Sequence, residues 1–356
     1  MRTRRMNLLT SVLVVLAFLA AACGGGDPAE TGGGGDGGEG GGGTSAALAF
    51  DVGGLGDQSF NDAAYKGLQD AIDEGIVSEG DTDYIEPNAS GSNRDDNVVL
   101  LAEEGFDLVV AVGFAFSPGI DEIAPEHPDT DFAVVDGFAA EADNVANLTF
   151  KEHEGSFLVG AAAALKSEAG TIGFLGGQKG TGLIEKFEAG YVAGAQEVNP
   201  DIEVLVEYIG DSTQAFNDPT KGEALSAKMY DAGADVVYHA AGASGAGLFK
   251  AAVEANKWAI GVDSDQSLTA SPEQRKLILT SMLKRVDTAV HDAIQQVDQG
   301  QFKSGTQVFG LAEEGVGYAV NQYNDNDQLL SKDIQSQLED LKEQIINGDI
   351  TVPTEP

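Results

Sequence analysis

Short apolar runs alternate with amphipathic stretches along the chain from Ala46 onward. The runs have the length of buried strands, and the stretches between them place apolar residues at helical spacing. Strands that alternate with helices form βαβ units, which build parallel sheets with helices on both faces. The expected strands are Ala47–Asp51, Thr82–Ile85, Leu108–Val112, Phe132–Val135, Thr171–Leu175, Glu203–Tyr208, Val236–His239, Trp258–Val262 and Leu277–Thr280. The expected helices are Phe60–Glu74, Asp95–Glu104, Gly155–Lys166, Glu185–Asn199, Thr220–Ala232 and Ala246–Asn256.

These expected strands are too many for one ordinary sheet, and a second run of units begins near Thr171. A chain of 356 residues also suits two cores better than one. We therefore expect an α/β protein with two doubly wound parallel-sheet lobes. Near the C-terminus, Leu338, Leu341 and Ile345 indicate a further helix packed on a lobe.

The N-terminus has the features of a secretory signal. Residues 1–22 begin with arginines, continue with an apolar core at Leu8–Ala20 and end in small residues. That core is short for a membrane-spanning helix, which needs about 20 residues. The end of the segment is similar to a bacterial lipobox, with Cys23 as the lipidated residue, although Leu19 stands four places before the cysteine rather than three. We expect lipidation at Cys23 in preference to plain cleavage or an uncleaved anchor.

Residues 23–45 are dominated by glycine and cannot bury apolar surface, so they predict a flexible tether. A lipid at Cys23 and this tether together predict a protein held to the cell membrane on its extracytoplasmic face.

Charge and composition exclude several function classes. The chain has 20 Lys+Arg against 58 Asp+Glu, a net charge of −38, and this surface would repel nucleic acid. Cys23 is the only cysteine, which leaves the folded part without a disulfide or a thiolate nucleophile. The four histidines have no metal-ligand spacing, and the glycine-rich turn after the first strand lacks a dinucleotide-binding GxGxxG pattern. A zinc site would be hard to build from these histidines, and a carboxylate site for a hard cation stays an alternative; we expect no metal and no cofactor.

Acidic residues follow several of the expected strands. Asp51 ends the first strand, Asp136 follows the fourth, and Asp263 follows Trp258–Val262. Ligands of open α/β sheets bind outside the carboxyl ends of the strands. These positions therefore predict one shared binding site, although loops after strands are rich in aspartate in any case.

The segment 51–64, DVGGLGDQSFNDAA, is the first motif at such a strand end. Its glycines permit a close approach of backbone to ligand, and Ser59 can cap the helix that follows. Asp51 and Asn61 would supply polar contacts and Phe60 an aromatic face. The alternative is an ordinary turn between strand and helix.

Three further candidates lie in the second half of the chain. Phe216 sits in a loop rich in small and polar residues, and it is either buried under that loop or directed into a cleft. Gly242 precedes a helix, and we expect the N-terminal amides of this helix to face a ligand. The alternative is that the glycine only permits close packing of strand and helix. Lys284 follows the last strand and either neutralises a carboxylate beside a sugar oxygen or lies at the surface. Asp263 would accept hydrogen bonds from vicinal hydroxyls, and Asp265 is the neighbouring alternative.

Seven segments occur in order between about Ala46 and Val320. They are D51-x-GG-x-x-D-x-SFN61, V134-V-D136, G155-SFLVG160, G173-FLGG177, G233-ADV236, I260-GVDSDQ266 and T280-SMLK284. Together they resemble the basic membrane protein (BMP/PnrA-like) family.

The resemblance implies a type I periplasmic-binding-protein fold whose two lobes are joined by three crossings. It implies a nucleoside ligand, a purine nucleoside above all, delivered to the permease of an ABC importer. Phe60 and Phe216 would stack on the base, and Asp51, Asn61 and Asp136 would contact it. The ribose would be held by Gly242, Asp263 and Lys284. The expected lobes are 46–148 with 281–312, and 149–280 with 313–350.

Other functions remain alternatives. A sugar-binding protein of the same fold would also use aromatic residues and aspartates. A nucleoside hydrolase clusters N-terminal aspartates around a cation, which Asp51 and Asp57 suggest only weakly. A surface adhesin would gain no stability from a small ligand.

Overall fold

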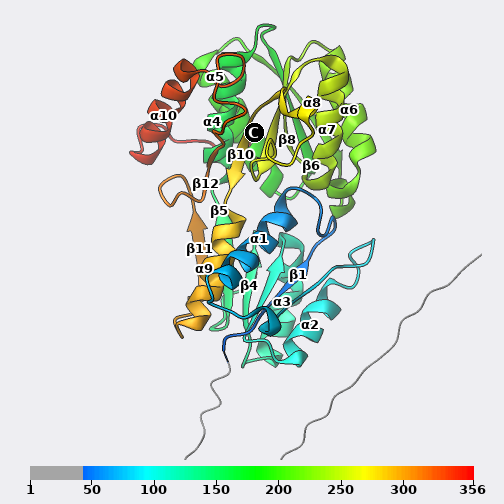
Figure 1. Cartoon of the computed structure of the whole chain (residues 1–356), viewed down its shortest axis with the longest axis vertical. Helices are drawn as coiled ribbons and strands as arrows, with labels where there is room; N and C mark the ends of the chain where they lie inside the picture. Colours follow the sequence, from blue (N-terminus) through cyan, green and yellow to red (C-terminus); the bar gives the residue numbers. More distant parts are fainter. Residues whose placement is uncertain (1–42) are drawn as a thin grey trace, which may run out of the picture. The chain divides into compact units, whose positions relative to one another are not determined.

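The computed structural model describes residues 43–356, which form one compact unit (Figure 1). The predicted signal peptide, the lipidation site at Cys23 and nearly all of the predicted tether lie outside the described residues. Within residues 43–356, the helices are all too short or too polar to pass through a bilayer.

The first sheet, in what we call lobe 1, consists of six strands that are all parallel. Its central strands are buried on both faces, as expected for a parallel sheet between two layers of helices. In spatial order the strands are β11 (Gly305–Phe309), β5 (Val145–Phe150), β4 (Asp131–Val135), β3 (Leu108–Val112), β1 (Ala46–Phe50) and β2 (Thr82–Ile85).

The second sheet, in lobe 2, repeats this arrangement with one antiparallel strand at its edge. The order is β12 (Val316–Tyr318), β10 (Ile278–Lys284), β9 (Trp258–Asp263), β8 (Val236–Ala240), β6 (Thr171–Gln178) and β7 (Glu203–Gly210). Two α/β lobes with parallel sheets were expected from the sequence, so the predicted fold class is confirmed.

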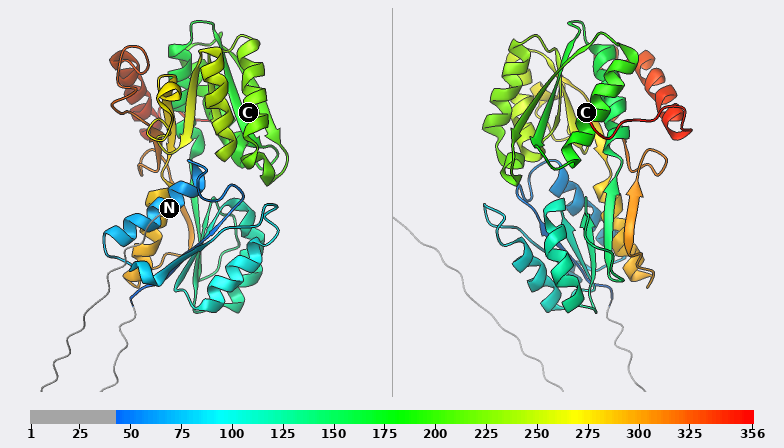
Figure 2. Two further views of the ribbon diagram at one scale, coloured as in Figure 1. Left: turned by 45° about the vertical axis from the view of Figure 1, so that its right-hand side comes forward. Right: turned by 180° about the vertical axis from the view of Figure 1, so that it is seen from behind.

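Helices cover both faces of each sheet (Figure 2). Lobe 1 carries α1 (Phe60–Asp73), α2 (Arg94–Glu104), α3 (Ser117–Ile123) and α9 (Val286–Asp298). Lobe 2 carries α4 (Glu152–Lys166), α5 (Leu183–Val198), α6 (Pro219–Asp231), α7 (Gly245–Ala255), α8 (Pro272–Arg275) and α10 (Lys332–Ile346).

Helices α4 and α5 pack backbone to backbone. A Cβ atom added at Gly194 would lie 1.9 Å from the carbonyl oxygen of Phe157, and one added at Gly160 would lie 2.1 Å from that of Tyr191. Only glycine permits this approach. Near the start of both helices, Lys186 Nζ of α5 lies 3.6 Å from Glu152 Oε2 of α4.

The chain crosses between the two sheets three times. Strand β5 of lobe 1 runs into α4, β10 of lobe 2 runs into α9, and the last crossing lies between Phe309 and Val316. The lobes predicted from the sequence change at residues 148 and 280. In the structure the strands that lead into the first two crossings end at Phe150 and Lys284.

Every strand expected from the sequence is present, but β5, β11 and β12 were not predicted. β11 alternates between half-buried and exposed positions at the edge of its sheet, which gives it no continuous apolar run. The predicted C-terminal helix is confirmed as α10, with Leu338, Leu341 and Ile345 buried against the rest of lobe 2.

Candidate functional site

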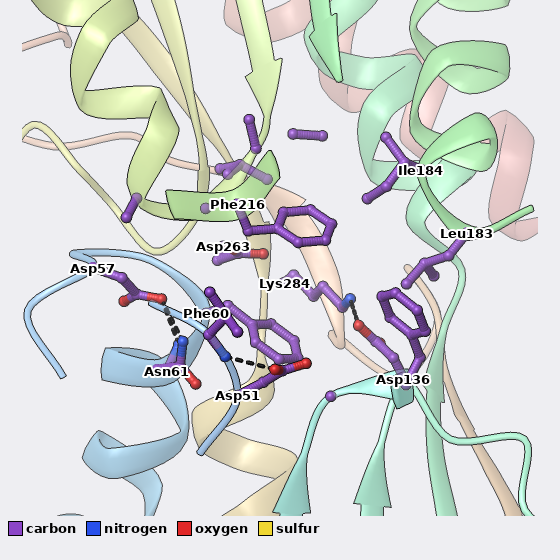
Figure 3. Close-up of a pocket in the computed structure, with 18 of the residues that line it drawn as sticks. Asp51, Asp57, Phe60, Asn61, Asp136, Leu183, Ile184, Phe216, Asp263 and Lys284 are labelled. Atoms are coloured by element: carbon purple, nitrogen blue, oxygen red, sulfur yellow. Dashed lines mark hydrogen bonds and ion pairs between the residues drawn. The ribbon is translucent and has the colours of Figure 1, made fainter. Parts of the chain in front are cut away.

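One pocket lies at the carboxyl ends of the strands of both sheets (Figure 3). Its cavity volume is about 70 Å³. The walls come from both lobes, and they include all eight residues selected from the sequence: Asp51, Phe60, Asn61, Asp136, Phe216, Gly242, Asp263 and Lys284. Asp265 is not among the lining residues; its side chain accepts hydrogen bonds from Ser267 and Asn321.

Three of these residues have left-handed backbone conformations. The φ angles are +57° at Asp136, +65° at Asp263 and +54° at Gly242, and each residue stands at or just beyond the end of a strand. Such φ values are uncommon for residues with a side chain and cluster at functional sites. At the two aspartates this conformation accompanies a buried side chain that lines the pocket.

The N-terminus of α1 is capped by Asp57, not by Ser59 as the sequence suggested. The Asp57 carboxylate accepts hydrogen bonds from the backbone N–H groups of Ser59, Asn61 and Asp62 at 2.9 to 3.1 Å. It also accepts one from Asn61 Nδ2 at 3.0 Å. The Asn61 amide is therefore held in a fixed orientation, and its Oδ1 has no hydrogen-bond partner among the described residues.

Ser59 instead links the two lobes. Its hydroxyl donates a short hydrogen bond to Oδ2 of Asp263, which ends β9 of the other lobe. Burial raises the pKa of Asp263 to about 6, although Lys284 and the Ser59 hydroxyl act in the opposite direction. The carboxylate thus titrates near neutral pH.

Lys284 lies at the centre of a buried charge cluster. Its ammonium donates to Asp136 Oδ2 at 2.6 Å and lies 3.4 Å from Glu152 Oε1, and all three side chains are at most 4 % exposed. Burial alone would lower the pKa of Lys284, but Asp136, Glu152 and Asp263 together raise it. The lysine is charged, and it ties β10 of lobe 2 to the end of β4 in lobe 1.

Aromatic rings surround the same ammonium. The distances from Lys284 Nζ to the ring centroids are 5.2 Å for Phe60, 5.0 Å for Phe150 and 5.5 Å for Phe187. Rings at this range are attracted to a cation, and the attraction is larger when the cation is desolvated. The rings also keep water away from the ion pair.

Phe60 and Phe216 approach the pocket from different lobes (Figure 3). Phe60 begins α1, and Phe216 lies in the one-turn helix Thr213–Asn217 that follows β7. The Phe216 ring packs on the bare backbone of Gly177, where an added Cβ would lie 2.3 Å from ring atom Cε1. The sequence left Phe216 either buried under its loop or directed into a cleft. In the structure the residue is half-buried and also lines the pocket.

Several lining residues were not selected from the sequence. Leu183, Ile184 and Phe187, from the first turns of α5, supply an apolar wall. Glu152, fully buried at the start of α4, has no hydrogen-bond donor within residues 43–356 for either oxygen, and burial raises its pKa. It does not line the main pocket but an adjoining space of about 310 Å³, which shares Phe114, Asp136 and Leu183 with the main pocket.

Arg94 was missed as well, although it bears directly on Asp51. Its Nε donates to Asp51 Oδ1 at 2.6 Å. A signal was present, because Arg94 is the only lysine or arginine between Lys66 and Lys151. A solitary cation in an acidic stretch indicates a specific partner.

The chemistry of the pocket favours an uncharged guest. Several carboxylates surround Lys284, whose charge is already engaged by Asp136 and Glu152. Acceptor atoms without donors among the residues described, Asn61 Oδ1 and Asp136 Oδ1, are available to N–H and O–H groups. An anionic guest would meet repulsion from Asp51, Asp136 and Asp263.

Comparisons with known proteins identify the family. Residues 44–355 match the family model described as ABC transporter substrate-binding protein PnrA-like. The chain belongs to this family. It is a solute-binding protein of an ABC transporter and not an enzyme.

Individual relatives are similar to this chain over most of its length. The CD4+ T-cell-stimulating antigen of Listeria monocytogenes is 36% identical over 326 residues, covering 88% of each chain. The ABC transporter nucleoside-binding protein BmpA of Lactococcus lactis is 35% identical over 324 residues, covering 87% of this chain and 89% of that one. A solute-binding protein of Aeropyrum pernix superposes with a TM-score of 0.75 at 29% identity, covering 87% and 93% of the two chains.

Membership in this family has two consequences. The fold is that of the type I periplasmic binding proteins, as the resemblance implied. A solute-binding component of an ABC transporter also works with a membrane permease, which is therefore a partner of this chain.

Proposed function

We propose that this protein captures a purine nucleoside between its two lobes and delivers it to the permease of an ABC importer. The observation that carries the proposal is the pairing of Phe60 and Phe216, which come from opposite lobes, in one pocket with buried acidic acceptors. A planar base between two aromatic faces gains on the order of 1–3 kcal/mol from stacking on each.

The distribution of polar groups supports a base at one end and a sugar at the other. Asp51 and Asn61 stand together in lobe 1 as acceptors for base N–H donors. Asp263 and Lys284, at the ends of β9 and β10, offer an acceptor and a donor for vicinal hydroxyls. Asp136 is ion-paired with Lys284, and this contact favours a role for Asp136 at the sugar end.

The printed name of the Lactococcus lactis relative adds support, since that protein is described as nucleoside-binding. A sugar alone would fill only the end of the pocket at Asp263 and would leave the aromatic pair without a planar partner. We also propose that Cys23 carries a lipid, so that the protein is tethered to the extracytoplasmic face of the cell membrane.

The test is a thermal-shift panel on the purified folded part, with guanosine, inosine, adenosine, their 5′-monophosphates and free pentoses. A ligand that binds only the folded state stabilises it by RT ln(1 + [L]/Kd), about 2.7 kcal/mol at roughly 100 times Kd. We expect at least one purine nucleoside to raise the melting temperature and its monophosphate to have no effect. Phe60→Ala and Asp263→Ala should each abolish the shift. A panel in which only pentoses raise the melting temperature, or in which nothing does, would refute the nucleoside assignment.

A further inference from the structure

Arg94, in the first turn of α2, lies outside the pocket wall but contacts one of its carboxylates. Nε donates to Asp51 Oδ1 at 2.6 Å, and Nη2 forms an ion pair with the same oxygen. Nη1 donates to the carbonyl oxygen of Gly91 at 2.9 Å, and Nη2 donates to Thr213 Oγ1 at 3.0 Å. The guanidinium thus joins Asp51 of lobe 1 to Thr213 of lobe 2.

These contacts divide the two oxygens of Asp51. Oδ1 accepts from Arg94 and, at 2.5 Å, from the backbone N–H of Val52. All hydrogen bonds that the Asp51 carboxylate accepts within the described chain end on this oxygen. Oδ2 is left as the acceptor for a guest in the pocket that Asp51 lines. An ionised carboxylate held this way accepts hydrogen bonds and cannot donate one.

The loop before α2 is built around the guanidinium. The Asn88 side chain accepts hydrogen bonds from the backbone of Ser90 and Ser92, which closes a tight turn. Gly91 has a φ of +71°, and a Cβ there would lie 2.5 to 2.7 Å from the atoms of the guanidinium. The loop also reaches lobe 2 directly, because Gln214 Nε2 donates to the carbonyl oxygen of Ala89 at 3.0 Å.

The lobe 2 side of this contact is the one-turn helix that carries Phe216. Thr213 and Phe216 both belong to the segment Thr213–Asn217. A guanidinium that contacts both Asp51 and Thr213 therefore fixes the position of the Phe216 ring, the expected stacking ring, relative to the Asp51 acceptor of the other lobe. The contact area is well shielded, since the side chains of Arg94 and Asp51 are 14% and 13% exposed.

We propose that Arg94 is a positioning residue for ligand recognition, which holds Asp51 with Oδ2 toward the guest and couples that acceptor to the Phe216 segment of the other lobe. The inference rests on the proposed nucleoside function, and it adds a requirement on the ligand. The group that meets Asp51 must be a hydrogen-bond donor, which on a purine base is an N–H. Burial raises the pKa of Asp51 and Arg94 acts against this rise, which favours the ionised acceptor.

The experiment measures Kd by calorimetry and the dissociation rate by stopped flow, with the tightest-binding purine nucleoside as the probe. Arg94→Met removes the charge and the planar set of donors, Arg94→Lys keeps the charge but loses the two-donor geometry, and Thr213→Val removes only the hydrogen bond between Arg94 and Thr213. Asp51→Asn alone and together with Arg94→Met completes a double-mutant cycle.

We expect Arg94→Met to weaken binding roughly 10- to 100-fold, the usual effect of losing hydrogen bonds to a charged group. Arg94→Lys should recover part of that loss. Thr213→Val should weaken binding at most about tenfold, and this weakening should appear as faster dissociation. In the Arg94→Met background, Asp51→Asn should add little, because Arg94 acts through Asp51.

The inference is overturned if Arg94→Met binds within about twofold of wild type, or if the Arg94 and Asp51 substitutions multiply as independent sites do. A general loss of folding would lower the melting temperature of the unliganded Arg94→Met protein. Arg94→Lys is then the deciding variant: a lower affinity at an unchanged melting temperature supports the inference, and an unchanged affinity overturns it. A wild-type chain that binds no nucleoside would refute the proposed function itself, and this inference with it.

Discussion

Replacing Lys284 by methionine should destabilise the unliganded protein severely. The Lys284 side chain is 2 % exposed, and its ammonium lies 2.6 Å from Asp136 and 3.4 Å from Glu152. Methionine preserves most of the side-chain volume but leaves these carboxylates without their cation. Removing one partner of a buried ion pair typically costs 3–5 kcal/mol, because the remaining charge stays buried and unpaired. We expect a loss of about 4 kcal/mol in the free energy of unfolding.

Urea unfolding of the two proteins measures this loss. Lys186→Met is the matched control, since Lys186 lies 3.6 Å from the other oxygen of Glu152 but is 35% exposed. A pair with an exposed partner contributes only about 0–1 kcal/mol. A Lys284→Met protein as stable as the Lys186→Met protein would refute the buried cluster.

The pH dependence of the same variant provides a second check. Burial raises the pKa of Glu152 and of Asp263, and Lys284 counteracts both rises. Without Lys284 these folded-state pKa values rise further above their unfolded values. The destabilisation is then greatest at neutral pH, where the carboxylates are charged, and shrinks as they become protonated toward about pH 5. A deficit that grows on acidification would contradict this reasoning.

Two further results are expected from the site itself. Because Asp263 has a pKa of about 6 and would accept hydrogen bonds from the ligand as a carboxylate, nucleoside affinity should fall as the pH drops through that value. Calorimetry across pH checks this, with Asp263→Asn as the control that lacks the titrating group. A nucleoside affinity that is as independent of pH in the wild type as in Asp263→Asn would count against it. Gly177→Ala should displace the Phe216 ring, since its Cβ would lie 2.3 Å from Cε1. We expect at least about fivefold weaker binding from the lost stacking, whereas Gly80→Ala, which meets no atom within 4 Å, should bind as wild type does.

The sequence was sufficient to predict most strands of both sheets because parallel strands buried on both faces appear as continuous apolar runs. It also identified pocket residues such as Asp136 and Asp263, since each stands at a strand end, where ligands of this kind of fold bind. The edge strand β11 lacks such a run, and its place beside β5 depends on contacts made more than 150 residues away in the chain.

Contacts between the lobes could not be predicted from local patterns. Ser59 has the residue type and position of a helix cap, yet its hydroxyl bonds to Asp263 because Asp57 already satisfies the amides of α1. Glu152 looks like an ordinary acidic residue in a first helical turn. Its complete burial arises only because the chain crosses between lobes at that point and brings Lys284 beside it.

A crystal structure of the protein with a bound purine nucleoside is the most direct measurement of the central claim. We expect the base to lie between the rings of Phe60 and Phe216, with a base N–H on Asp51 and the sugar hydroxyls at Asp263 and Lys284. A nucleoside bound elsewhere on the molecule, or a base that contacts neither ring, would contradict the account.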